Sequence, residues 1–207
     1  MRKSKKKLLV EGVDDQHVIW ALCQKYHIPE TFEVIDCKGI NNLEAQIPLR
    51  FKESGVDTVG VIIDADTNLN VRWESIKRIL TGQGFFIPEV IPTAGLIVTD
   101  ADNRKAGVWI MPDNNSNLED FISFLVPDGD PLLPIAHSTL DLIESKNLNR
   151  YSGLHRSKAV IHSWLAWQEN PGVPMGLSIT KRYLSTDMPI CSDSLKWLTE
   201  LFEAGIR

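Results

Sequence analysis

The sequence has few cysteines and no long apolar run. The 207 residues include only three cysteines, which are widely separated and form no Cys-x-x-Cys pair: Cys23, Cys37 and Cys191. This pattern argues against a disulfide framework and a cysteine zinc site, so a cytoplasmic location is expected. No stretch is apolar for the length of a membrane span, and Glu11 interrupts the short apolar run that follows the basic leader. We therefore expect no membrane association and no secretory signal.

Excess positive charge and a P-loop are also missing. The net charge of -5 argues against a wide, passive DNA-binding surface. The chain has no Gly-x-x-x-x-Gly-Lys-Ser/Thr motif, so it carries no P-loop of its own. A nucleic-acid enzyme remains compatible with the charge, because metal-binding carboxylates add negative charge that bound cations neutralise.

Strand and helix patterns alternate over the first 125 residues. Strands are expected at 7–10, 32–36, 56–63 and 107–111, and helices at 14–26, 39–53, 68–82 and 118–125. This alternation predicts an α/β fold in which helices cover both faces of a mostly parallel sheet.

Only helical patterns follow from about Pro127. They cover 133–145, 157–168, 175–184 and 192–204. No linker is long enough to separate independent domains. We predict a basic leader at 1–7, an α/β domain at 8–126, and a helical C-terminal extension at 127–207 that packs on the same domain.

Three of the predicted strands end in a carboxylate: Glu11, Asp64 and Asp113. Ligands of open α/β sheets sit outside the carboxyl ends of the strands, and parallel strands bring these ends to one edge. The sequence therefore predicts a cluster of acidic side chains at that edge.

Further carboxylates stand close to these strand ends. Asp66 follows Asp64 by two residues, so both side chains project to the same side of an extended chain. Asp15 follows Glu11 by four residues and faces the same cleft if a helix begins near Val13. Oxygen ligands suit Mg²⁺ or Mn²⁺, and two such cations would stabilise both the attacking and the leaving oxygen in phosphoryl displacement.

Each acidic residue also has a purely structural interpretation. An Asp-x-Asp after a strand is often a turn or a helix cap, and Asp14 is expected to be an N-cap rather than a ligand. Glu119 and Asp120 at a helix start would favourably meet the helix dipole without any metal. The coincidence of three strand ends supports a metal site more strongly than any single motif does.

Four motifs in this order resemble the Toprim domain: Glu11 to Asp15, Asp64 to Asp66, Met111 to Asn114 and Leu118 to Phe121. The resemblance spans residues 8 to about 125. It is closest to small stand-alone Toprim-like proteins of unknown function that are related to the OLD family of nucleases. It implies a Rossmann-like Toprim fold.

The resemblance also implies residue roles. Glu11 would be the general acid/base or a metal ligand, Asp64 and Asp66 would hold magnesium, and Asp15 would serve a second metal. The less sharply defined assignments are a later acidic pair at Glu119 and Asp120, and a catalytic lysine at either Lys158 or Lys181.

The chain departs from the larger members of this superfamily. It has no room for the tyrosine-bearing domain of a topoisomerase, and it lacks the zinc module of a primase and the ATPase domain of an OLD nuclease. A partner ATPase chain would supply that activity, or the protein acts without one. Arg150, Arg156 and Lys158 form a basic cluster that would contact nucleic-acid phosphates or else be a solvated face.

The leading prediction is Mg²⁺-dependent (or Mn²⁺-dependent) phosphodiester cleavage of DNA or RNA, with a metal-activated water attacking phosphorus. One alternative is a non-catalytic Toprim module that binds metal or nucleotide and serves a partner ATPase or defence complex. Another is a small-molecule phosphotransferase or phosphohydrolase. Homo-oligomerisation is left open.

Overall fold

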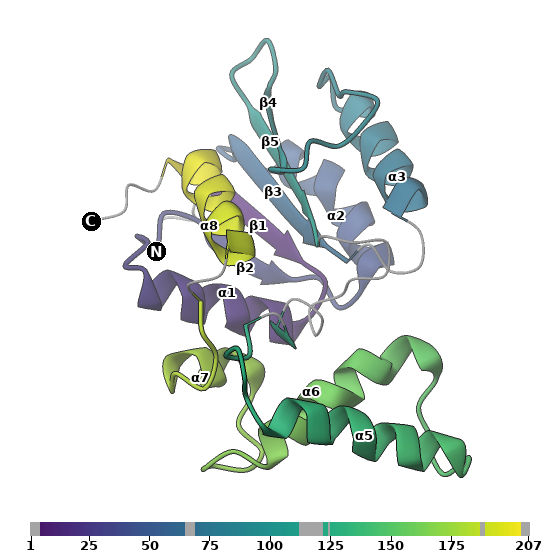
Figure 1. Ribbon diagram of the computed structural model, residues 1–207. Helices are drawn as coiled ribbons and strands as arrows, with labels where there is room; N and C mark the ends of the chain where they lie inside the picture. The colour runs from purple at the N-terminus through teal and green to yellow at the C-terminus, as the bar shows by residue number, and fades with distance from the viewer. Residues whose placement is uncertain (1–4, 65–68, 112–121, 124, 187–188, 204–207) are drawn as a thin grey trace.

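The computed structural model in Figure 1 describes residues 5–64, 69–111, 122–123, 125–186 and 189–203. In this part of the chain, five strands form one sheet of order β2-β1-β3-β5-β4. The strands are β1 (Lys6–Val10), β2 (Glu33–Asp36), β3 (Thr58–Ile63), β4 (Leu96–Thr99) and β5 (Lys105–Ile110). All neighbouring strands pair in parallel except β4 and β5. The predicted mostly parallel α/β sheet is confirmed.

Helices connect the strands and continue after the sheet. Those between the strands are α1 (Val13–Lys25), α2 (Ile40–Lys52) and α3 (Leu69–Gly82). Those after the sheet are α5 (Leu132–Ser145), the short 3-10 helix η1 (Gly153–His155), α6 (Arg156–Ala166), α7 (Met175–Thr180) and α8 (Pro189–Phe202). Most bounds lie within a few residues of the sequence-based ranges. Of the helix expected at 118–125, most residues lie outside the described part of the chain.

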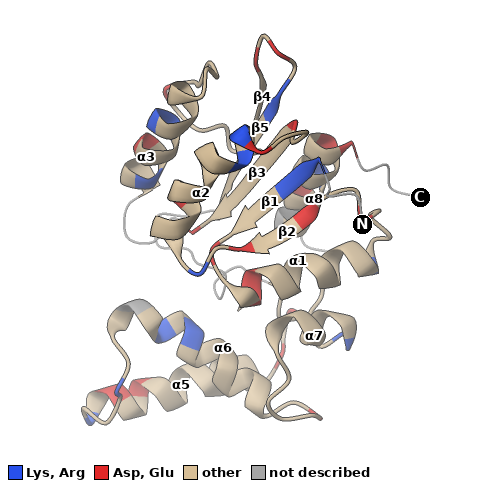
Figure 2. Ribbon diagram, turned by 180° about the vertical axis from the view of Figure 1, so that it is seen from behind, with Lys and Arg blue, Asp and Glu red and all other residues tan. Residues whose placement is uncertain are grey.

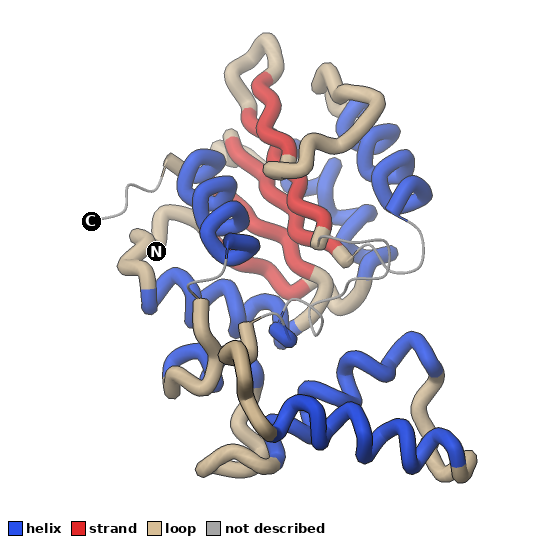
Figure 3. The backbone as a smooth tube through the Cα atoms, in the orientation of Figure 1, coloured by secondary structure: helices blue, strands red, loops and turns tan. Residues whose placement is uncertain are grey.

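Helices cover both faces of the sheet, as predicted. α1 and α8 lie over one face, and α2 and α3 lie over the other (Figure 3). Every residue of β3 is buried, which explains its mostly apolar sequence. Ile62 packs with the α1 and α8 layer, whereas its neighbours Val61 and Ile63 pack with α2 and α3. This alternation fixes the strand between two apolar layers.

Two glycines make room for α8 on the sheet. Gly60 of β3 pairs directly with Gly107 of β5. A Cβ atom at Gly107 would lie 2.4 Å from Leu201 Cδ2, and one at Gly60 would lie 2.7 Å from the same atom. Because Leu201 is completely buried, it has little space into which to retreat. The glycine pair therefore sets how closely α8 approaches the sheet.

The antiparallel edge strand β4 is absent from the sequence-based prediction. Leu96–Thr99 is a short apolar run, and it joins β5 through a tight turn. The Asp100 carboxylate organises this turn by accepting hydrogen bonds from the backbone N–H groups of Asp102 and Arg104, at 2.9 Å each. An aspartate that binds the backbone in this way is a common turn former.

The N-terminal strand begins earlier than predicted. β1 begins at Lys6, one residue before the predicted strand at 7–10. Lys7 is only 2% exposed, and its ammonium pairs with Glu33 of β2 at 2.5 Å. The run of lysines before Leu8 obscured where the strand begins. A lysine can be buried in a strand when its charge is paired, whereas burial of an unpaired lysine would be costly.

The helices after the sheet pack in two ways. α7 packs closely on α1, where a Cβ at Gly176 would lie 2.6 Å from the His17 carbonyl oxygen. α5 and α6 form a hairpin that extends away from the sheet (Figure 1). Trp164 of α6 is buried and donates through Nε1 to Asp130, just before α5, at 2.9 Å. Among the described residues, no helix is both long enough and apolar enough to cross a membrane.

Candidate functional site

The carboxyl ends of β1 and β3 meet at one edge of the sheet. The Asp64 backbone N–H, just after β3, donates to Glu11 Oε1, just after β1, at 2.8 Å. Glu11 is further fixed through its own carbonyl, which accepts from the Gly39 N–H at 2.7 Å. Two predicted site residues are thus brought together at the edge where the sequence places them.

Asp15 lies in the first turn of α1, which begins at Val13. Its Oδ2 accepts a hydrogen bond from the Gly12 backbone N–H at 2.9 Å. Gly12, and not Asp14, is the N-cap residue, so the expected capping role of Asp14 is wrong. A glycine has no side chain to cap the helix, and Asp15 stabilises the turn from inside it.

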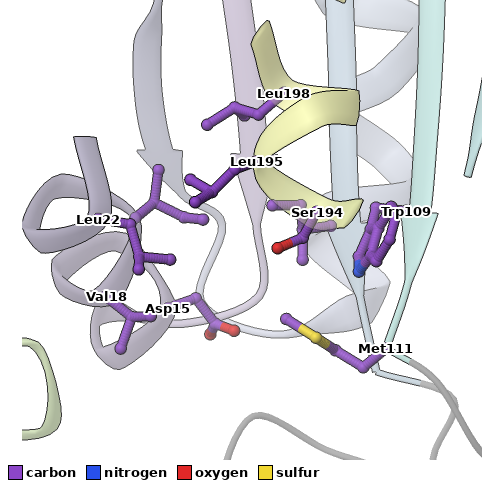
Figure 4. A pocket seen from close by; sticks show the side chains of 10 residues that line it. Asp15, Val18, Leu22, Trp109, Met111, Ser194, Leu195 and Leu198 are labelled. Atoms are coloured by element: carbon purple, nitrogen blue, oxygen red, sulfur yellow. The ribbon is translucent and has the colours of Figure 1, made fainter. Parts of the chain in front are cut away.

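An apolar slot between α1 and α8 leads inward from Asp15. Its walls are mainly Val18, Ile19, Leu22, Ile62, Trp109, Met111, Leu195 and Leu198. Asp15 and Met111 lie at the same end of the slot, and Ser194 faces it from α8 (Figure 4). Asp15 is only 9% exposed. Its carboxylate is therefore partly shielded from water, which strengthens its interactions with nearby charges.

A lysine from the helical part of the chain reaches the same region. Lys158 Nζ of α6 lies 3.9 Å from Asp14 Oδ2 of α1. Both side chains are partly exposed, so this ion pair adds little stability. The pair matters for its position, because it places the Lys158 ammonium beside Asp14, the neighbour of Asp15 in the sequence. The other candidate, Lys181, is exposed after the end of α7.

The rest of the predicted basic cluster is arranged differently. The Arg156 guanidinium binds Asp141 at 2.5 Å and Glu144 at 3.1 Å within the α5–α6 hairpin. Hydrogen bonds from Tyr151 and Arg156 hold the pKa of Glu144 below its ordinary value, so the pair stays charged. Arg150 is exposed near the tip of the hairpin. These contacts give Arg156 a role in joining α5 to α6.

Sequence reasoning missed one carboxylate at this edge. Asp36 ends β2 and stands opposite Val10 in the register of β1 and β2. Its Oδ1 accepts from the Lys38 N–H at 2.8 Å, as in a turn-forming aspartate. The alternation of strands and helices was enough to find it, because Asp36 closes a predicted strand just as Asp64 does.

Cys37 lies next to this edge but supplies no thiolate. Burial raises the pKa of its thiol to about 11, with opposing contributions that include the nearby Arg50. At neutral pH it therefore remains a thiol, which is a poor metal ligand. The donors at the edge are accordingly oxygens, the kind that Mg²⁺ and Mn²⁺ prefer.

The described carboxylates do not by themselves complete a metal site. No group of three or more His, Cys, Asp or Glu side chains among the described residues is arranged to hold a metal ion. The remaining predicted ligands, Asp66, Asp113, Glu119 and Asp120, lie outside the described residues. The oxygen donor set fits a hard divalent cation in its chemistry. Figure 2 shows the acidic first turn of α1 that contributes to it.

A family model matches residues 5–203, which is almost the entire chain. The chain belongs to this family, which is described as "Protein of unknown function (DUF3226)". The match includes the strand ends, α1 and all the helices after the sheet, so one family pattern joins the acidic edge to the helical part of the chain. No curated protein and no solved structure matches the chain.

Proposed function

We propose that this chain is a Toprim-like enzyme that cleaves phosphodiester bonds in nucleic acid with the help of Mg²⁺ or Mn²⁺. The observation that carries the proposal is the hydrogen bond between the Asp64 N–H and Glu11 Oε1. It joins two acidic residues from neighbouring parallel strands at the edge where α/β folds bind ligands.

The side chains at the edge have distinct proposed tasks. Asp64, together with Asp66, would hold one cation, and Glu11 and Asp15 would help to hold a second. Such cations polarise a phosphoryl oxygen and lower the pKa of water. Glu11 is also positioned by two backbone contacts, so it could accept or deliver a proton from a fixed place.

Lys158 is the better of the two lysine candidates. Its contact with Asp14 holds a positive charge beside the first turn of α1. A cation there would attract a phosphate and stabilise negative charge that develops during its cleavage. Lys181 has no described contact with this edge, so it would have no catalytic task.

A non-catalytic binding module is the second candidate, and two observations favour it. Glu11 and Asp15 both accept backbone hydrogen bonds that stabilise the strand end and the helix start. Carboxylates can be retained for these structural tasks alone. In that case the protein would bind metal or nucleotide on behalf of a partner ATPase, without cleaving anything.

The substitution Glu11→Gln separates the two functions. Glutamine keeps an oxygen that can accept from the Asp64 N–H but removes the charge and the acid/base group. Purified wild type and variant would be incubated with supercoiled plasmid, single-stranded DNA, RNA and free nucleotides, in Mg²⁺, Mn²⁺ or chelator. We expect metal-dependent cleavage that falls about 100-fold or more in Glu11→Gln.

Asp36→Asn is the matched control, because it removes a carboxylate from the same edge while keeping an acceptor for the Lys38 N–H. It should change the cleavage rate less than Glu11→Gln does. Equal activity of wild type and Glu11→Gln would contradict the proposal. Folded protein without cleavage in either metal would favour the binding module, and cleavage of nucleotides alone would indicate a small-molecule phosphohydrolase.

A further inference from the structure

The outer face of α5 is an apolar surface that the described part of the chain leaves uncovered. Ile135 is 51% exposed and Leu142 is 56% exposed. They lie two helical turns apart, so both point from the same face. Ser138 and Thr139 lie between them, and with Pro134 these residues line a shallow groove. We call Ile135, Ser138, Thr139 and Leu142 the α5 stripe.

The stripe is on the side of α5 that faces away from the core. Ala136 and Leu140, the buried residues of α5, lie on the opposite side of the helix and join the core that includes α6. The ion pairs of Arg156 with Asp141 and Glu144 lie on a third side. Of the described residues, none that lines the groove is charged. The packing of α5 on the core and its ion pairs with α6 therefore do not use the stripe.

Charges at the two ends of the stripe have opposite signs. Asp128 is exposed just before the helix, whereas Lys146 is its C-cap and Arg150 follows, beside the ion pairs that Arg156 makes with Asp141 and Glu144. Two copies of α5 that pack antiparallel would place the acidic end of each against the basic end of the other. Ile135 of one copy would then meet Leu142 of its partner, with the small Ser138 and Thr139 at the centre. A twofold interface needs this kind of self-complementarity.

We propose that the α5 stripe is a dimerisation surface that pairs with the same stripe of a second copy of this chain in antiparallel orientation. One helix face on each side buries less area than a standard stable interface. The dimer is accordingly weak and concentration-dependent. This inference is independent of the proposed cleavage activity.

Crosslinking tests the register directly. All three native cysteines are buried, so an introduced surface cysteine is the main reactive thiol. In antiparallel pairing, two Ser138→Cys residues face each other at the centre, whereas two Ser145→Cys residues lie about 20 Å apart along the axis. A short bismaleimide should therefore crosslink the Ser138→Cys protein and leave the Ser145→Cys protein monomeric.

Sedimentation equilibrium of the full chain measures the strength of the association. Ile135→Asn should weaken it on the order of tenfold, whereas Leu49→Asn on α2, which replaces a residue that is 61% exposed, should not change it. Lys146→Glu should weaken it, and adding Asp128→Lys should restore it.

Three results would overturn the proposal. They are a monomer at every soluble concentration, crosslinking of both cysteine variants, and a dimer that is unaffected by Ile135→Asn. A monomer at every concentration would mean that no second copy binds the stripe. The second would indicate parallel or nonspecific contact, and the third would place the interface elsewhere.

Discussion

The sheet and the α5–α6 hairpin bury their residues to very different extents. Every residue of β3 is buried between two layers of helices, whereas only Ala136 and Leu140 are buried in the longer α5. A strand that is held on both faces has one position, so the residues at its end are held in place as well. A helix packed on one side tolerates change on the other. The acidic edge lies at the end of strands that are held on both faces, whereas the α5 stripe lies on the unpacked side of a helix.

The largest expected effect comes from filling the glycine contact between the sheet and α8. Gly107→Val would push its side chain into the buried Leu201 and into Trp197. We expect this overpacking to lower the free energy of unfolding by about 3 kcal/mol, as measured by urea denaturation.

Gly153→Ala is the control in the hairpin region, because a Cβ there would meet no atom of the described residues within 4 Å. It should change the free energy of unfolding by less than about 0.5 kcal/mol. If both substitutions had similar effects, the sheet would not be the more tightly packed region.

A smaller effect is expected in the turn that joins β4 to β5. The Asp100 side chain is 4% exposed and binds the Arg104 side chain at 2.7 Å. Burial acts to raise its pKa, but hydrogen bonds from Arg104 and Asp102 outweigh this and lower it overall. Asp100→Asn should reduce the free energy of unfolding by about 2 kcal/mol at neutral pH.

The same carboxylate makes a pH-dependent prediction. Because its pKa is lower in the folded state than in the unfolded state, it stabilises the fold above the unfolded pKa of about 4. This contribution is lost as the pH falls through the folded pKa. The stability difference between wild type and Asp100→Asn should therefore shrink on acidification. A difference that stayed constant from pH 7 to strong acid would contradict this role.

The smallest effect on stability is expected at the contact between Lys158 of α6 and Asp14 of α1. Lys158→Met and Lys181→Met should each change the free energy of unfolding by less than about 0.5 kcal/mol, because both lysines are at least partly exposed. In a cleavage assay only Lys158→Met should reduce the rate. Equal loss in both variants would argue against a specific task for Lys158 at the acidic edge.

Much of the sheet could be predicted from sequence because its physics is local. The mostly apolar run at 56–63 and the carboxylate that follows it located both β3 and Asp64. The β4 strand was missed because it is short and at the sheet edge. The burial of Lys7 was not predicted because it depends on Glu33, a partner on another strand.

The contacts of the candidate site were harder to predict. Sequence spacing placed Glu11 near Asp64, but it did not predict that a backbone N–H would join them. Asp14 was expected to be a cap because its residue type favours that position, yet the adjacent Asp15 binds Gly12 instead. Lys158 could not be chosen over Lys181, because its contact with Asp14 depends on how α6 packs. Tertiary packing decides each of these.

The most direct test of the central claim, that the acidic edge binds a divalent cation, is Mn²⁺ titration by calorimetry of wild type and Asp64→Asn. Asparagine leaves the Asp64 backbone N–H in place for Glu11 but removes one negative charge from the edge. We predict saturable binding to wild type and an affinity at least about tenfold lower in the variant. Equal affinity in the two proteins, or no binding to folded wild type, would contradict the account.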